Sequence, residues 1–424
     1  MIKREYEKYS DYIEFQSEKT LDPVKRKKWL NEEWRLKIDG FKNEFNKLSN
    51  YLKPESRCLC LGARTGQEVV ALNELGVKNV IGIDIVPNEP YVVEGDIHNL
   101  KYEDESFDFV YTNIIDHSIN PKKMVEEIER VLKVGGIFYL QIQLGINQDK
   151  YTEFEIKNPV HDVVSLFDQS YCTHVKTINS DGQINFAGMN VELVFVKDQK
   201  LKNMFEKYGN LESLVVPEEY QELWDNINLP TQTKKLDDNG ITNEETREKI
   251  LQDLSKRSYF LTRLCEVYNC KNICEVGTAE GWQYFSFCEY AKNNGGFVVS
   301  CDQRDVRHKE YVEKYEKFSK FYNGTSQDVS QNESDRGFDF FYIDGLHDKN
   351  SVLFDVANLI KTQSKDRLPV WVFDDFDERF GCYEDIWQIV NSSPGFKIWN
   401  VGLTASGKPS HQAMINSRFA VSEN

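Results

Sequence analysis

Three carboxylates and a histidine follow two apolar segments in the second half of the chain. Asp344 ends the segment FDFFYID and is followed by His347, while Asp374 and Asp375 end PVWVFDD. If these segments are neighbouring parallel strands, their carboxyl ends meet at one edge of the sheet and the carboxylates converge. Three carboxylate oxygens suit a hard cation such as Mg²⁺, and an adjacent imidazole can take a proton. The alternative is that the aspartates are caps and turn residues and that His347 caps the next helix.

A glycine-containing loop precedes these residues. It reads Glu275-Val-Gly277-Thr-Ala-Glu-Gly281, and Asp302 ends the next apolar segment. Glycines at a helix N-terminus let a ligand lie against the backbone, and a carboxylate after the following strand can accept both hydroxyls of a ribose. The spacing GxxxG, with an acid two residues earlier, differs from the GxGxxG of dinucleotide sites. An ordinary strand-to-helix turn is the alternative.

The first half of the chain repeats this pattern. Gly62 and Gly66 stand in CLGARTG, Asp84 in GIDIVP and Asp96 in GDIHNL. Cys60 takes the place of the acidic residue and cannot accept the same hydrogen bonds, so we expect weaker ligand binding there.

The carboxylate set of the second half has no counterpart in the first. Asn113 stands where Asp344 does, and no paired aspartate follows GIFYLQIQ. His117, just after the corresponding apolar segment, could act as a base, or it could be a structural histidine.

Both loops lie in stretches where short apolar runs alternate with helix-like segments. The runs are CLCLG, NVIGID, FDFVYT, GIFYLQI and NVELVFVK, and later NICEVG, FVVSCD, FDFFYID and PVWVFDD. Such alternation predicts an α/β fold with a parallel sheet covered by helices on both faces. SFDFVYTN and GFDFFYID each fall at the fourth strand of their stretch. We therefore predict two doubly wound, Rossmann-like domains joined by a helical linker.

The domain boundaries follow from the same pattern. Thr242 and Glu245 fit a capping box that opens a helix running toward Tyr268. The predicted segments are an N-terminal helical segment (1–50), a first domain (51–198), a linker with helices (199–257) and a second domain (258–424).

The composition excludes some partners. The 424 residues carry a net charge of −17, which disfavours a nucleic-acid partner. No run approaches the roughly 20 apolar residues of a membrane span. The 9 cysteines show no CxxC spacing, so we expect them to be reduced and buried. These features predict a cytoplasmic protein without a membrane span.

The loops resemble the first motif of the class I S-adenosylmethionine-dependent methyltransferases, an acid followed by spaced glycines. The resemblance extends over roughly 50–198 and 258–424. It implies S-adenosylmethionine as the cofactor of both domains. The cofactor ligands that it implies are Gly62, Gly66, Asp84, Asp96, Glu275, Gly277, Gly281 and Asp302.

The second domain also resembles metal-dependent O-methyltransferases. GTSQD, with Ser326 and Gln327, is similar to the adenine-binding stretch of the catechol enzymes. Asp344-Gly-Leu-His347 is similar to the Asp-x-x-His of the macrolide-sugar enzymes, where the catechol enzymes have a lysine. This resemblance implies Mg²⁺ in the second domain with His347 as the base, and the ligands Asp344, Asp374 and Asp375.

These resemblances predict a bifunctional O-methyltransferase that acts on hydroxyls of a sugar or glycan. Transfer by the first domain would need no metal, with His117 as its base. A phenolic or other small natural product is an alternative substrate. Another alternative is a single activity, with the first domain serving as a non-catalytic binding or dimerisation module. A third is a non-enzymatic partner protein, and a homo-oligomer is compatible with each.

Overall fold

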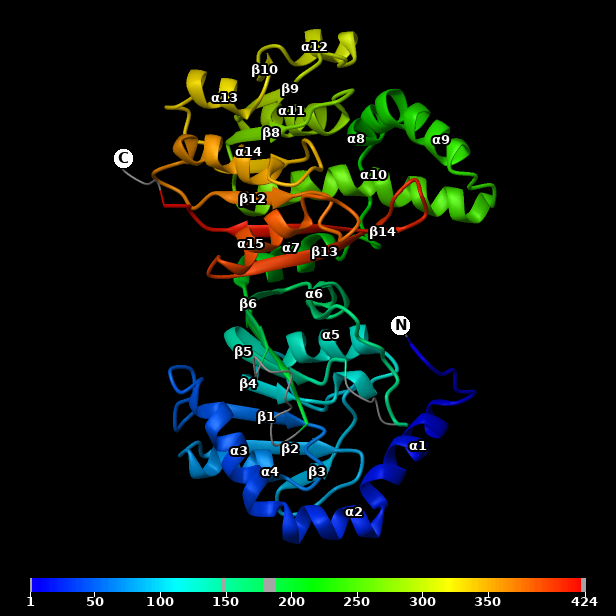
Figure 1. Cartoon of the computed structure of the whole chain (residues 1–424), viewed down its shortest axis with the longest axis vertical. Coiled ribbons are helices and arrows are strands. Elements are labelled where there is room, and N and C mark those ends of the chain that lie inside the picture. The colour runs from blue at the N-terminus through cyan, green and yellow to red at the C-terminus, as the bar shows by residue number, and fades with distance from the viewer. Residues whose placement is uncertain (1, 146–149, 178–187, 421–424) are drawn as a thin grey trace. The chain divides into compact units, whose positions relative to one another are not determined.

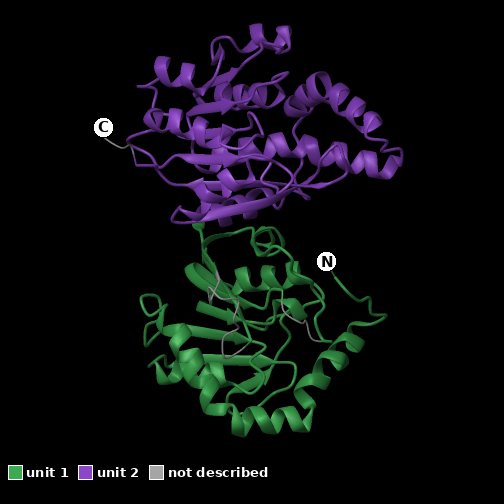
Figure 2. Ribbon diagram, in the orientation of Figure 1, with its two compact units in different colours: residues 1–199 green, residues 200–424 purple. Residues whose placement is uncertain are grey.

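The chain folds into two compact units, residues 1–199 and 200–424 (Figures 1 and 2). The structure is a computed structural model that describes residues 2–145, 150–177 and 188–420. Each unit contains β-strands in the same spatial order with helices packed on them.

The strands of unit 1 lie in the order β3-β2-β1-β4-β5-β7-β6. The five strands from β3 to β5 in this order are parallel to one another. Strand β7 is antiparallel to both of its neighbours, β5 and β6. Since the strand order reverses between β1 and β4, their carboxyl ends border the crevice where such sheets bind ligands. The bounds are β1 (Arg57–Leu61), β2 (Asn79–Asp84), β3 (Val92–Glu94), β4 (Phe107–Thr112), β5 (Leu132–Ile142), β6 (Ser170–Thr177) and β7 (Val191–Lys197).

Unit 2 repeats this arrangement with the order β10-β9-β8-β11-β12-β14-β13. Its β14 is antiparallel to β12 and β13, as β7 is to its neighbours in unit 1. The repeated apolar phrases form β4 and β11, which confirms the predicted repeat of a Rossmann-like sheet. The bounds are β8 (Asn272–Val276), β9 (Phe297–Asp302), β10 (Ser319–Asn323), β11 (Phe340–Ile343), β12 (Val370–Phe373), β13 (Phe396–Leu403) and β14 (Pro409–Asn416).

The N-terminal helices belong to unit 1. On α3, Phe41 and Phe45 are buried, and the Phe45 ring centroid lies 5.0 Å from that of Tyr111 on β4. The segment 1–50 that we separated from the first domain therefore forms part of its core. The helices are α1 (Tyr9–Leu21), α2 (Pro23–Lys27), the π-helix η1 (Lys28–Glu32), α3 (Trp34–Asn46), α4 (Gln67–Glu74), η2 (Ile115–His117), α5 (Pro121–Val131), α6 (Pro159–Asp162) and η3 (Val164–Leu166).

The segment 199–257, expected as a linker, packs into unit 2 from residue 200 onward. Trp224 and Trp282 have ring centroids 5.2 Å apart, and Leu236, Ile250 and Leu254 join the same apolar cluster. Apolar side chains at helical spacing bury themselves against a sheet whenever one is within reach.

The remaining helices belong largely to unit 2. They are α7 (Gln199–Tyr208), α8 (Glu218–Leu223), the π-helix η4 (Trp224–Asn228), α9 (Leu229–Asp238), α10 (Glu244–Val267), α11 (Trp282–Asn294), α12 (Lys309–Tyr315), α13 (Ser326–Asn332), α14 (Ser351–Leu359), η5 (Ile360–Thr362) and α15 (Tyr383–Asn391). The cap of α10 is Asn243 rather than Thr242, because Asn243 is extended and its side chain accepts a hydrogen bond from the Thr246 N–H.

All nine cysteines are buried and free of disulfides, as predicted. Within the described residues, none of the helices combines the length and apolarity that crossing a membrane requires.

Replacing Phe45 with alanine should destabilise unit 1 by about 3–5 kcal/mol, because a fully buried phenyl ring is lost and a cavity is left behind. Urea unfolding measures the change. Val24→Ala, at a side chain that is 77% exposed, is the control and should shift stability by less than about 0.5 kcal/mol. Equal, small effects would contradict the placement of α3 in the core.

Candidate functional site

The two glycine loops have matching backbone conformations. The first glycine has φ +67° at Gly62 and +90° at Gly277, and the second has +92° at both Gly66 and Gly281. A Cβ at Gly277 would lie 1.8 Å from the carbonyl oxygen of Asp344. At Gly62 it would lie 2.3 Å from a side-chain carbon of Ile114. Only glycine therefore allows each loop to contact the segment after the fourth strand.

Each loop binds the carboxylate that ends the second strand of its unit. The Arg64 N–H donates to Oδ2 of Asp84 over 3.0 Å, and the Ala279 N–H donates to Oδ2 of Asp302 over 2.9 Å. The two donors stand two residues after the first loop glycine, and both have left-handed φ values near +45° (48° and 45°). The carboxylates predicted to bind a ribose thus lie beside both loops in the same geometry.

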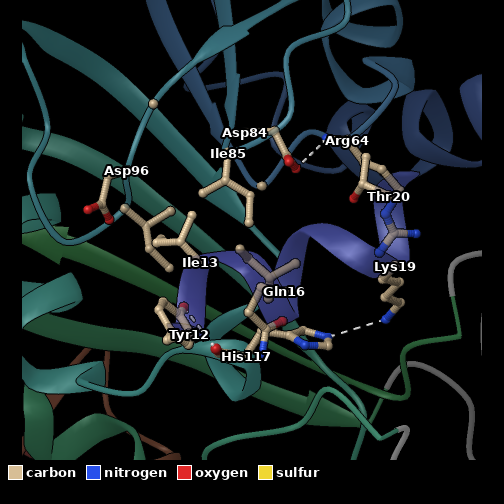
Figure 3. A pocket seen from close by; sticks show the side chains of 14 residues that line it. Tyr12, Ile13, Gln16, Lys19, Thr20, Arg64, Asp84, Ile85, Asp96 and His117 are labelled. Atoms are coloured by element: carbon tan, nitrogen blue, oxygen red, sulfur yellow. Dashed lines mark hydrogen bonds between the residues drawn. The ribbon is translucent and has the colours of Figure 1, made fainter. Parts of the chain in front are cut away.

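A pocket lies between the sheet edge of unit 1 and helix α1. Asp84 and Asp96 line it from the sheet edge, and Gly62 lines it from the loop. Figure 3 shows α1 crossing this pocket, a contribution that the sequence analysis missed because no motif marks that helix. The lining residues of α1 are Tyr12, Ile13, Gln16, Lys19 and Thr20.

Helix α1 also contacts two residues predicted for the first site. The hydroxyl of Tyr9 donates to Asp96, with both carboxylate oxygens 2.8 Å away. The Nδ1 of His117 lies 2.9 Å from the carbonyl oxygen of Tyr151, and its Nε2 lies 3.5 Å from Nζ of Lys19 (Figure 3). In the tautomer that donates from Nδ1, Nε2 is the acceptor atom of the ring, and Lys19 lies beside it.

A second cavity of unit 1 adjoins the first and shares Gly62, Arg64 and His117 with it. Asn113 and Glu68 also line it. His117 therefore lies where a ligand on the glycine loop and a second ligand could meet.

In unit 2 the structure brings Asp344, His347 and Asp375 together. One ligand atom from each lies within 4.8 Å of the others, and all three residues are half-buried. His347 bridges the carboxylates, with Nδ1 3.1 Å from Oδ2 of Asp375 and Nε2 3.5 Å from Oδ1 of Asp344.

Asp374, predicted as the third ligand, lies outside this cluster. Its Oδ1 pairs with the buried guanidinium of Arg257 and accepts from Nε2 of Gln412 over 3.1 Å. Its Oδ2 accepts from the hydroxyl of Tyr342 over 3.0 Å. Asp374 and Asp375 follow β12, and Asp375 has a left-handed φ of +51°, so the adjacent aspartates take different partners.

The cluster concentrates charge at the sheet edge. The pKa of Asp344 and of Asp375 is raised because both are buried and both lie near the negative charge of Asp374. The pKa of His347 is raised to about 9, mainly by its hydrogen bond to Asp344. The imidazolium thus balances part of the negative charge.

The stretch that was predicted to bind adenine in unit 2 forms the start of α13. Ser326 is fully buried, and its hydroxyl donates to Oδ1 of Asp355 over 2.6 Å. Gln327 is exposed, and its N–H donates to Oγ1 of Thr325, the cap of α13. The Ser326 hydroxyl also accepts from Nδ2 of Asn358 over 3.1 Å, so within the protein it is bound to α14.

Glu275, the acidic residue before the second loop, is completely buried at the end of β8. Its Oε2 accepts from the hydroxyl of Ser300 over 2.6 Å, while Oε1 is buried without a hydrogen-bond partner among the described residues. Burial raises the pKa of Glu275 to about 8.

Comparisons with known protein families find one match in each unit. Residues 59–140 match the family model of a methyltransferase domain, and residues 274–376 match a second methyltransferase domain model. The matched stretches run from the first strand into the fifth strand in unit 1 and through the fifth strand in unit 2, and so include both glycine loops.

Relatives of known sequence or structure are distant. A stretch of 133 residues is 32% identical to an uncharacterized protein of Methanocaldococcus jannaschii, covering 29% of this chain and 58% of that protein. A 1,6-didemethyltoxoflavin-N1-methyltransferase of Burkholderia thailandensis is 13% identical over 47% of this chain and 94% of its own, with a TM-score of 0.35. A putative S-adenosylmethionine-dependent methyltransferase of Listeria monocytogenes is 13% identical over 37% and 98%, with a TM-score of 0.29.

Replacing Glu275 with glutamine should flatten the pH dependence of stability of the second methyltransferase domain. With a folded pKa of about 8 and an unfolded pKa near 4.5, the folded state holds a proton that the unfolded state releases. Stability is then greatest below pH 4.5 and falls as pH rises toward 8, whereas a neutral glutamine has no such dependence. Urea unfolding at pH 5.5, 7 and 8.5 measures the difference.

Glu316→Gln, at an exposed glutamate of the same unit, is the control and should follow the wild-type curve. Parallel curves for Glu275→Gln and wild type would show that Glu275 is ionised in the folded protein.

Proposed function

We propose that the protein is an S-adenosylmethionine-dependent methyltransferase with one cofactor site in each domain. The repeated geometry of glycine loop and carboxylate carries this proposal. In both domains a loop N–H is bound to the carboxylate after the second strand, at the carboxyl edge of a Rossmann-like sheet. Ordinary strand-to-helix turns have no reason to repeat the same hydrogen bond to a strand-end carboxylate in both stretches that match a methyltransferase domain model.

The residues of unit 1 fit the cofactor. The loop backbone can approach a ligand closely at Gly62 and Gly66, where side chains are sterically excluded. Asp84 can accept from ribose hydroxyls, and the pocket extends from it to Asp96. S-adenosylmethionine, when bound, supplies an electrophilic methyl group. Asp84 and the loop orient it, α1 excludes water, and His117 accepts the substrate proton at Nε2.

We further propose that unit 2 methylates a hydroxyl with the help of a divalent cation. Asp344 and Asp375 provide hard oxygen donors that lie close together. The pKa of each is raised because negative charge accumulates there, and a divalent cation would balance that charge. A bound cation would lower the pKa of a hydroxyl beside it. With a cation balancing the charge of Asp344 and Asp375, His347 would be neutral, and its Nε2 could take the substrate proton while Asp375 orients the ring through Nδ1.

A sugar or glycan is the substrate we favour for unit 2. Two protein carboxylates leave positions in an octahedral shell for substrate oxygens, and a sugar offers neighbouring hydroxyls. A catechol-like phenol shares that chemistry and is the alternative. In the part of the chain that the structure describes, Asp344, His347 and Asp375 form the only group of this kind, so transfer in unit 1 is proposed to need no metal.

The cofactor proposal predicts two S-adenosylhomocysteine sites per chain by isothermal titration calorimetry. Asp84→Asn should weaken one site and Asp302→Asn the other, each by about 10- to 100-fold, since hydrogen bonds to a charged acceptor are lost. Asp104→Asn, at a carboxylate that is 74% exposed on its side chain, should change neither. A single site that responds only to Asp302→Asn would instead support a non-catalytic first domain.

The metal proposal predicts that chelation abolishes methyl transfer to sugars by unit 2 and that added Mg²⁺ or Mn²⁺ restores it. Asp375→Asn should weaken metal binding, which Mn²⁺ titration measures directly. His347→Ala should slow transfer by about 10²–10⁴, the usual contribution of a general base. Asp377→Asn, at a nearby aspartate paired with Arg379, is the control.

Asp374→Asn separates the structural role from the ligand role. It removes the charge that faces buried Arg257, so it should lower the melting temperature strongly while metal affinity stays near wild type. A loss of metal affinity equal to that of Asp375→Asn would return Asp374 to the ligand set.

A further inference from the structure

The carboxylate beside the glycine loop stands on a different element in each unit. Cys60 near the end of β1 corresponds to Glu275 on β8, and Glu68 on α4 corresponds to Gln283 on α11. The correspondence holds residue by residue, because both segments have a five-residue strand, the same loop length and a helix capped by the second loop glycine. At these two corresponding positions each unit therefore has one carboxylate, which is Glu275 on the strand in unit 2 and Glu68 on the helix in unit 1.

Glu68 is a buried acid without a complete set of partners. It is only 7% exposed, and its Oε2 is buried with no hydrogen-bond partner among the described residues. It lines the second cavity of unit 1 together with Gly62 and Asn113. A buried, unpaired carboxylate oxygen is costly, so its presence at a cavity wall points to a ligand that donates to it.

The neighbouring cations have other partners. Arg64 places its guanidinium 4.4 Å from the ring centroid of Trp29, and Nζ of Lys37 pairs with Glu33 at 3.0 Å. Both lower the pKa of Glu68, and Asp84 raises it, but burial dominates and the pKa is raised to about 7. A cationic donor in the cavity would both complete the hydrogen bonding of Glu68 and stabilise its charge.

We propose that Glu68 binds the α-amino group of the methionyl part of S-adenosylmethionine in unit 1. It would replace the strand carboxylate that unit 2 has at Glu275 and that unit 1 lacks, since Cys60 stands at that position. This inference rests on the proposed function of unit 1. Gly62 lines both the pocket that contains Asp84 and the cavity that contains Glu68. A ligand with its ribose at Asp84 therefore extends past Gly62 toward Glu68, and an ammonium group there offers three donors.

The test compares two ligands that share adenosine. S-adenosylhomocysteine carries the amino group, whereas 5′-methylthioadenosine lacks the whole amino-acid portion. Both are titrated calorimetrically into the full-length protein carrying Asp302→Asn, which weakens the site of unit 2. Glu68→Gln, the residue type that unit 2 has at this position, should weaken S-adenosylhomocysteine about tenfold or more and leave 5′-methylthioadenosine unchanged.

Further variants control for structural effects. Glu126→Gln, at a half-buried glutamate of α5 that lines neither cavity, should alter neither ligand. Adding Cys60→Glu to Glu68→Gln restores an acid at the strand position and should recover part of the affinity for S-adenosylhomocysteine. Glu68→Asp, which keeps the charge, should cost less affinity than Glu68→Gln.

Two results would overturn the inference while leaving the proposed function intact. One is unchanged affinity of Glu68→Gln for S-adenosylhomocysteine, and the other is an equal loss for both ligands, which marks a structural role. If neither ligand binds unit 1 of the Asp302→Asn protein, the proposed function of unit 1 fails and this inference with it.

Discussion

Each unit depends on the close approach between its glycine loop and the segment after its fourth strand. At Gly277 even a methyl group would overlap the carbonyl of Asp344. The left-handed turn that permits this approach also directs one loop N–H at the carboxylate after the second strand. The loop, the ribose-binding candidate and the start of the cluster at Asp344 are therefore placed by a single backbone conformation, which recurs in unit 1.

The two units differ in how they place buried charge around this shared frame. Unit 2 buries Glu275 on the strand and balances Asp374 with Arg257, whereas unit 1 has Cys60 on the strand and Glu68 on the helix. Breaking a buried ion pair is far more costly than its net contribution suggests, so such residues hold a site in one arrangement. The proposed difference between a metal-assisted site in unit 2 and a metal-free site in unit 1 rests on this difference in buried charge.

The strands that the sequence predicted correctly are those buried on both faces, such as β4 and β11, whose continuous apolar runs leave little ambiguity. The short β3 and the partly exposed β10 were missed, because their mixed composition resembles that of loops. The N-terminal helices were predicted as helices but not as part of the first unit. Helical spacing shows that a face is apolar and does not show which sheet will cover it.

The sequence by itself determined the repeated sheet, the two glycine loops and the carboxylates at the strand ends, because each depends on neighbours within a few residues. Only the tertiary structure decided which of those carboxylates share a site. Asp374 pairs with Arg257, which lies 117 positions earlier in the chain, and the hydroxyl of Ser326 donates a hydrogen bond to Asp355. Helix α1 and Glu68 reach their cavities without any motif. These contacts depend on which distant segments are buried together and on how their charges balance. The spacing of residues along the chain does not contain that information.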